Sequence, residues 1–160
     1  MHVRTWQVAY ADVLPAARLR DITVESRTER WRRLLDAQPA TERTAVAELD
    51  GDVVGFVSTG PAREDERRGE LYAIYVHPDV WGTGSGRALM ASALEHLRAE
   101  GFADAILWVL EDNPRARRFY ERAGWSADGG AKLETVLGVD APHVRYAIEL
   151  AEEAGSTAAE

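Results

Sequence analysis

Three glycines at alternate positions separate an apolar segment from a helix-like pattern, an arrangement suited to binding an anion. They are Gly82, Gly84 and Gly86. Glycine has no Cβ, so its backbone can adopt positive φ and let a ligand approach the N–H groups closely. Apolar residues then follow at helical spacing: Leu89, Met90, Ala93, Leu94 and Leu97. A helix N-terminus at the glycines would attract a phosphate or pyrophosphate, and Arg87 in its first turn would add a full charge.

Two other classes of phosphate-binding protein also use glycine-rich loops, and this loop fits neither. No Lys-Ser or Lys-Thr pair follows Gly86, as a P-loop requires. The glycine spacing is not G-x-G-x-x-G at the start of a repeated βαβ unit. The loop alone leaves open a role for the glycines in close helix packing.

A second pattern lies downstream, where Asn113 and Pro114 precede a basic and aromatic helix. With both patterns, residues 1–150 resemble the GNAT superfamily of N-acetyltransferases. That family binds acetyl-CoA through a Q/R-x-x-G-x-G/A loop after its fourth strand and carries an N-x-x-A-x-x-F/Y-Y helix after its fifth. The matching residues here are Trp81, Gly82, Thr83, Gly84, Ser85 and Gly86 in the loop, and Asn113, Ala116, Phe119 and Tyr120 in the helix. Trp81 stands where the family usually has Gln or Arg, so that side-chain contribution is expected to be lost or made by Arg87.

The resemblance implies two catalytic residues. Glu70, eleven residues before Trp81, takes the place of the family's catalytic glutamate; an ordinary solvent-facing residue at a strand end is the alternative. Tyr120 matches the general acid that protonates the leaving thiolate, and the alternative is a tyrosine packed in the core. His77 is a further candidate base acting through water, although a strand-end histidine before Pro78 also suits a structural role.

The resemblance also implies a set of contacts to acetyl-CoA as co-substrate. The backbone of Tyr75 and Val76 would bind the pantetheine arm and supply the oxyanion donor, and Asn113 would cap its helix and touch the same arm. The expected cofactor-binding residues are Tyr75, Val76, Trp81, Gly82, Thr83, Gly84, Ser85, Gly86, Arg87, Asn113, Arg115, Ala116 and Phe119. We predict no metal, because the chain has no Cys and its histidines lack metal-ligand spacing.

The pattern along the chain predicts a mixed α/β fold in a single domain, residues 1–150, followed by a disordered tail over 151–160. Helices are expected over 2–10, over 15–20 and from Ser26, where Glu29 completes a capping box. A hairpin should join strands 44–49 and 53–58 through Asp50-Gly51. Strand 70–77 is apolar on both faces, with Leu71, Ala73 and Tyr75 on one side and Tyr72, Ile74 and Val76 on the other.

The second half should contain a helix ending near Gly101, a strand over 103–110 and a helix between Asn113 and Gly124. Strands are then expected from Trp125, over 132–139 and over 144–150, with loops at 128–131 and 140–142. The family fold implies a mostly antiparallel sheet that splays between the fourth and fifth strands. The family's usual first strand is missing before Met1 or lies upstream, and the edge this would expose favours a homodimer.

Composition narrows the function further. The net charge of −8 argues against a nucleic-acid partner. No apolar run is long enough to span a membrane, and the N-terminus lacks the charged-then-apolar pattern of an export signal, so we expect a cytoplasmic protein. The expected activity is transfer of acetyl from acetyl-CoA to a primary amine of a small molecule, and the acidic balance favours a cationic acceptor. The alternatives are a non-catalytic acyl-CoA-binding or sensor domain on the same fold and, if ATP binds more tightly than CoA, a nucleotide-binding enzyme.

Overall fold

The structure, a computed structural model, describes residues 1–12 and 14–150. The helices are α1 (His2–Ala9), α2 (Ala16–Arg20), α3 (Val24–Asp36), η1 (Pro78–Val80, a 3₁₀ turn), α4 (Ser85–Ala99) and α5 (Pro114–Arg122). The strands are β1 (Arg43–Leu49), β2 (Asp52–Pro61), β3 (Gly69–Val76), β4 (Asp104–Leu110), β5 (Ser126–Val136) and β6 (Val139–Glu149). The tail expected over 151–160 lies outside the described residues.

The six strands of the described residues form one mixed sheet in the order β1-β2-β3-β4-β6-β5. Within residues 1–12 and 14–150, only the β3–β4 pair is parallel, and it joins just Gly69 with Ala105 and Glu70 with Ile106 before the strands part. The expected mostly antiparallel sheet with a splayed pair is therefore confirmed, β3 and β4 corresponding to the family's fourth and fifth strands. The splay leaves one edge of β3 without a strand partner beyond Glu70.

A β-bulge in β3 changes which side chains share a face. Ser58 pairs with Ala73 but Thr59 pairs with Leu71, so Tyr72 is the extra residue. A bulge interrupts the alternation of side chains. Leu71, Ile74 and Val76 accordingly pack together in the core beneath α4, and the predicted grouping of Leu71 with Ala73 and Tyr75 was wrong.

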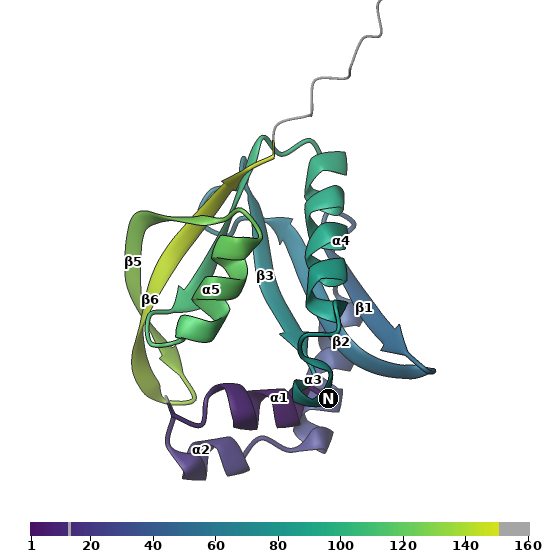
Figure 1. Ribbon diagram of the computed structural model, residues 1–160, viewed down its shortest axis with the longest axis vertical. Helices are drawn as coiled ribbons and strands as arrows, with labels where there is room; N and C mark the ends of the chain where they lie inside the picture. The colour runs from purple at the N-terminus through teal and green to yellow at the C-terminus, as the bar shows by residue number, and fades with distance from the viewer. Residues whose placement is uncertain (13, 151–160) are drawn as a thin grey trace, which may run out of the picture.

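Helices α4 and α5 cover one face of the sheet, with α1 to α3 at its lower end (Figure 1). Leu89, Met90 and Leu97 of α4 are buried against Leu71 and Val57 of the sheet. Trp31 of α3 meets Phe56 of β2 with ring centroids 4.7 Å apart. Phe56 and Val57 are neighbours in a strand, so their side chains lie on opposite faces, and the sheet is covered on both sides.

The N-terminal helices pack against the tip of the β5–β6 hairpin through a small second core. Its buried members are Leu14, Leu19 and Ile22, with Val136, Leu137 and Val139 packed beside them. The first residue of α3 is Val24, because Thr23 and not Ser26 is the cap. The Thr23 hydroxyl accepts from the Ser26 N–H at 3.1 Å, and the Thr23 N–H donates to the Ser26 hydroxyl at 3.3 Å.

The C-terminal part contains two long strands where three short ones were predicted. The segment expected as a loop over 128–131 is a bulge within β5, between Ala127 and Ala131. The hairpin turn lies at Leu137 and Gly138, both with positive φ, and not over 140–142. Pro142 lies inside β6, and its carbonyl accepts from the Glu111 N–H. Predicting the turn from Asp140 and Pro142 therefore misplaced it.

Candidate active site

The glycine loop leads into α4 as the sequence predicted, and the helix begins without a side-chain cap. Gly84 is the N-cap with φ +95°, and Gly82 has φ +80°. A Cβ at either position would meet nothing within 4 Å, so both face open space. The first hydrogen bond of the helix runs from the Ala88 N–H to the Gly84 carbonyl at 3.0 Å. The amide groups of the first turn are thus left for an external acceptor.

Gly86 serves a different purpose from the other two glycines. A Cβ there would lie 3.3 Å from Cε2 of Phe119 and 3.7 Å from Cγ2 of Val76. This small residue lets α4 approach α5 at the point where Phe119 packs. The sequence allowed two interpretations of the glycines. Close helix packing explains Gly86, and ligand access explains Gly82 and Gly84.

Trp81 does more than replace the family's Gln or Arg. Its indole N–H donates to the Val76 carbonyl at 2.8 Å, which holds the loop against the end of β3. The Arg115 guanidinium lies 3.1 Å from the centroid of the same ring. This cation–π contact links α5 to the loop and keeps Arg115 beside the α4 N-terminus. Arg87 is exposed in the first turn of α4.

The open edge of β3 presents backbone donors toward the splay at this end of the sheet. The His77 N–H donates to the Val54 carbonyl of β2 at 2.7 Å. Backbone groups alternate sides along a strand, so the Val76 N–H points away from β2 and into the splay, whereas the Tyr75 N–H faces β2. Tyr75 and Val76 were both expected to contact the pantetheine arm through the backbone. The N–H of Val76 points toward the splay, where such a ligand would lie, and the N–H of Tyr75 does not.

Tyr120 lies on α5 with only 8% of its surface exposed. Asn113 begins this helix as predicted, its side chain accepting from the Ala116 N–H at 3.1 Å, and Gly124 follows the end with φ +95°. Burial raises the pKa of the Tyr120 phenol, and the nearby Tyr10 raises it further. Within the described residues the hydroxyl has no hydrogen-bond partner. A protonated, unpartnered phenol is available to donate to a ligand.

Glu70 stands at the closed end of the splay, opposite Ile106, and 8% of it is exposed. Its Oε2 accepts from the Arg63 N–H at 3.0 Å. Burial is the main cause that raises the pKa of this carboxyl, and the Arg63 hydrogen bond opposes it. Glu70 is therefore not the solvent-facing strand-end residue of the alternative interpretation. Val76, whose N–H points into the splay, is six residues along β3, about 20 Å at 3.3 Å per residue, so Glu70 would exchange a proton with an amine there through a chain of water molecules.

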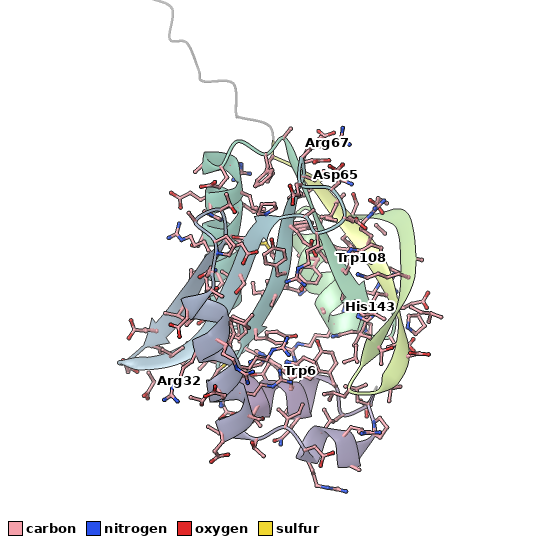
Figure 2. All side chains as sticks on the ribbon, turned by 180° about the vertical axis from the view of Figure 1, so that it is seen from behind. Trp6, Arg32, Asp65, Arg67, Trp108 and His143 are labelled. Carbon is pink, nitrogen blue, oxygen red and sulfur yellow. The ribbon has the colours of Figure 1, made fainter. Side chains whose placement is uncertain are left out.

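Aromatic residues line the opposite side of the sheet from α4, and of these the sequence analysis assigned Tyr75 alone to the site, through its backbone. Tyr10, directly after α1, and Tyr75 of β3 bring their hydroxyls within 3.2 Å, and the Trp6 and Tyr10 rings are 4.6 Å apart. Trp6 lies on this side in Figure 2, as do Trp108 of β4 and His143 of β6. The only signal in the sequence was the shared helical face of Trp6 and Tyr10, which equally suits a core helix.

Arg27 of α3 belongs to the same surface. Its guanidinium lies 4.9 Å from the centroid of the Trp6 ring. Burial lowers the pKa of Arg27, and the charge of Arg30 lowers it further. Four arginines crowd α3, and nothing in the sequence distinguished this one.

His77 has a structural contact at the start of η1. Its Nδ1 accepts from the Asp79 N–H at 3.2 Å, which caps the short helix. Among residues 1–12 and 14–150, no group of three or more potential metal ligands comes together, and no helix is long and apolar enough to cross a membrane.

Comparison with known proteins agrees with this geometry. The uncharacterized N-acetyltransferase YuaI of Bacillus subtilis is 33% identical over 117 residues, which are 71% of this chain and 65% of that protein. The mycothiol acetyltransferase of Streptomyces griseus is 43% identical over 81 residues, 51% of this chain and 26% of that protein. The chain thus matches less than two thirds of the length of both curated relatives.

A solved structure shares the fold over nearly the whole chain. The PaiA N-acetyltransferase of Thermoplasma acidophilum, in complex with coenzyme A, superposes with a TM-score of 0.68 at 19% identity, covering 92% of this chain and 87% of that one. Residues 7–125, well over half of the chain, match the profile of the Acetyltransferase (GNAT) family. The splayed strands, the glycine loop and the Asn113 helix are therefore those of a GNAT protein, and the chain belongs to the Acetyltransferase (GNAT) family.

Proposed function

We propose that this protein transfers an acetyl group from acetyl-CoA directly to a primary amine of a small molecule. The observation that carries the proposal is the uncapped N-terminus of α4, which opens through Gly82 and Gly84 beside the unpaired edge of β3. This arrangement offers amide donors for a pyrophosphate at the start of α4 and a backbone donor for an acyl carbonyl at the end of β3.

The residues present suit the parts of acetyl-CoA. The first-turn amides of α4 would hold the pyrophosphate, with Arg87 and the ring-stacked Arg115 adding positive charge. The Val76 N–H would bind the acetyl carbonyl and stabilise the oxyanion as charge develops there. Thr83, Ser85, Asn113, Ala116 and Phe119 would line the path of the nucleotide and pantetheine, as the family resemblance implies.

The chemistry requires two proton movements, and the chain offers a group for each. As the amine nitrogen bonds to the acetyl carbon, it loses a proton, which Glu70 would receive through water. As the C–S bond breaks, the sulfur takes the electron pair and a proton that Tyr120 would donate. Glu70 must be ionised and Tyr120 protonated for this, and the raised pKa of Tyr120 favours the required form.

The names of relatives support a small acceptor. One curated relative is a mycothiol acetyltransferase, and the structural neighbour with bound coenzyme A is an N-acetyltransferase. We further propose a homodimer, because β1 is an edge strand and the β1–β2 hairpin exposes Val46, Leu49 and Val53. A cytoplasmic location and the lack of a nucleic-acid partner stay predictions.

Release of free thiol from acetyl-CoA, measured across a panel of primary amines, tests the activity. We expect amine-dependent thiol release together with the N-acetylated product in a mass spectrum. Intact acetyl-CoA binding without turnover on any amine would favour the second candidate, a non-catalytic acyl-CoA sensor. The Tyr120 hydroxyl, which has no hydrogen-bond partner in the part of the chain that the structure describes, favours the enzyme, since a sensor needs no acid at that point.

A further inference from the structure

An arginine-rich groove lies between α2, α3 and the tip of the β5–β6 hairpin. Five arginines line it: Arg18, Arg27, Arg30, Arg33 and Arg63. Among the described residues, only two carboxylates, Asp21 and Glu42, share its wall, so the groove is strongly positive in a protein whose net charge is −8. We call this surface the arginine groove.

Most of these guanidinium groups lack a counter-charge. Arg33 pairs with Glu29 at 3.5 Å. In the part of the chain that the structure describes, no carboxylate lies within 4.0 Å of Arg18, Arg27, Arg30 or Arg63. The neighbouring charge of Arg30 even disfavours the charged form of Arg27. Like charges held together in this way are relieved by a bound anion.

The arginine groove adjoins the proposed base. Arg63 lines the groove, and its backbone N–H holds the Glu70 carboxylate at 3.0 Å. The Arg63 guanidinium lies 4.6 Å from the centroid of the Tyr72 ring, and Tyr72 is the bulged residue of β3. Arg27 connects the groove to Trp6 at the other side. The groove thus reaches Glu70 through Arg63, and none of its lining residues belongs to α4.

From these contacts we propose that the acceptor is an amine that also carries an oxyanion, a carboxylate or a phosphate, which the arginine groove binds. This deepens the proposed acetyl transfer and rests on it. Arg27 and Arg30 hold the oxyanion so that the amine end points toward the acetyl group, and Arg63 connects the groove to Glu70. This proposal replaces the cationic acceptor that the net charge led us to expect, because the local electric field at the site, and not the total charge of the protein, selects the ligand.

Matched pairs of amines test this. L-Phenylalanine is compared with phenethylamine and phosphoethanolamine with ethanolamine, so that a carboxylate and a phosphate are tested separately; spermidine is the cationic member. We expect kcat/KM to be at least tenfold higher for the anionic member of one pair, and spermidine to be poorer than either. Equal rates within each pair, or a preference for spermidine, would overturn the proposal while leaving the acetyltransferase activity established.

Variants separate the groove from intrinsic differences between amines. Arg27→Gln, or Arg30→Gln should the first fail to fold, should lower the anionic-to-neutral ratio of kcat/KM about tenfold. The amine pKa cancels in this ratio because the same pair is used with every variant. Arg32→Gln is the control, since Arg32 lies on the same helix outside the groove, at the outer edge in Figure 2. An unchanged ratio in Arg27→Gln and Arg30→Gln would also overturn the proposal.

Failure of the proposed activity is distinguishable. If no amine is acetylated, calorimetry with N-acetyl-L-phenylalanine and N-acetylphenethylamine decides the groove alone. If N-acetyl-L-phenylalanine binds at least tenfold more tightly than N-acetylphenethylamine, and if Arg30→Gln abolishes this difference, the result would support anion binding by the groove even without acetyl transfer. Equal affinities for the two compounds would overturn it.

Discussion

Two regions of this molecule present positive charge to an anion, and they do so with different groups. At the start of α4 the donors are backbone amides framed by Gly82 and Gly84, with Arg87 and Arg115 at the rim. In the arginine groove the donors are guanidinium groups from α2, α3 and the segment before β3. The first site would bind the cofactor by backbone geometry, and the second would select the acceptor by side-chain charge.

The difference shows in how each region depends on sequence. The glycines and first-turn amides of the α4 site lie within six consecutive residues, 82–87, so their geometry follows from local backbone conformation. The arginine groove joins Arg27 to Arg63, 36 residues apart, and exists only when α3 packs beside the sheet. Changes at the first should alter acetyl-CoA parameters, and changes at the second should alter acceptor parameters.

The largest expected effect is that of Tyr120→Phe on chemistry. Loss of the acid should lower kcat by roughly 10²- to 10⁴-fold with little change in KM for acetyl-CoA, because the hydroxyl acts on the developing thiolate. The melting temperature should change little, since the hydroxyl has no hydrogen-bond partner among the described residues. Steady-state kinetics and thermal melting on one preparation measure both.

Tyr146→Phe is the matched control for that variant. The Tyr146 hydroxyl donates to Glu121 at 2.8 Å and accepts from Arg117 at 3.0 Å, and the residue is fully buried. Its removal should destabilise the fold by about 1–2 kcal/mol and leave turnover close to wild type. Wild-type kcat in a folded Tyr120→Phe protein would remove Tyr120 from the mechanism.

Gly84→Val should weaken acetyl-CoA binding by about 100-fold. Valine cannot adopt φ +95° without strain, and its side chain would fill the space before the α4 amides. Loss of two amide-to-phosphate hydrogen bonds at about 1.5 kcal/mol each gives this figure. Calorimetry measures it, with Gly129→Val as control because Gly129 has φ +88° and equally open space on β5. Equal affinity in both folded variants would contradict the site.

Glu70→Gln should lower kcat/KM for the amine by roughly 10- to 10²-fold, at the lower end for a positioned base because water intervenes. The wild-type rate should rise with pH as Glu70 ionises. This rise should occur above the usual pKa range of a glutamate, because burial raises the pKa of Glu70, and it should be missing from the pH–rate profile of the variant. A pH–rate profile measures it. The same limb in both proteins would point to another base.

Stability should respond to the same group with the opposite sense. Because the folded pKa of Glu70 is raised, the native state binds its proton more tightly than the unfolded chain. The stability from this group is present below the unfolded pKa and is lost as pH rises through the folded pKa. The melting temperature of Glu70→Gln minus that of the wild type should therefore increase from pH 4 to pH 7, which thermal melts across that range measure.

Arg87→Ala should have the smallest effect, a three- to tenfold rise in KM for acetyl-CoA. The side chain is exposed, and a charge there is screened by solvent and salt. The rise should shrink at high salt, and binding of a pantetheine analogue without phosphates should not change. Arg98→Ala, near the other end of α4, is the control. If pantetheine binding weakens as much, Arg87 does not act through the phosphates.

Local chemistry determined much of this protein from sequence alone. The glycines with positive φ, the Asn113 cap with Pro114, and the Asp50-Gly51 turn depend on residues within a few positions of one another, and each lies where predicted. These features were enough to predict the family, the splayed sheet and the α4 anion site. Backbone conformational preferences act over short range, which is why a sequence pattern can encode them.

Only the tertiary structure decided what the opposite side of the sheet presents. The bulge at Tyr72 reassigned the faces of β3, because strand register depends on the partner strand as well as on alternation. The β5–β6 turn moved to Leu137 and Gly138, since pairing along both strands outweighed the turn residues at Asp140 and Pro142. The arginine groove likewise arises from contacts between distant segments, so the charge that meets the acceptor is set by packing and not by any single stretch of sequence.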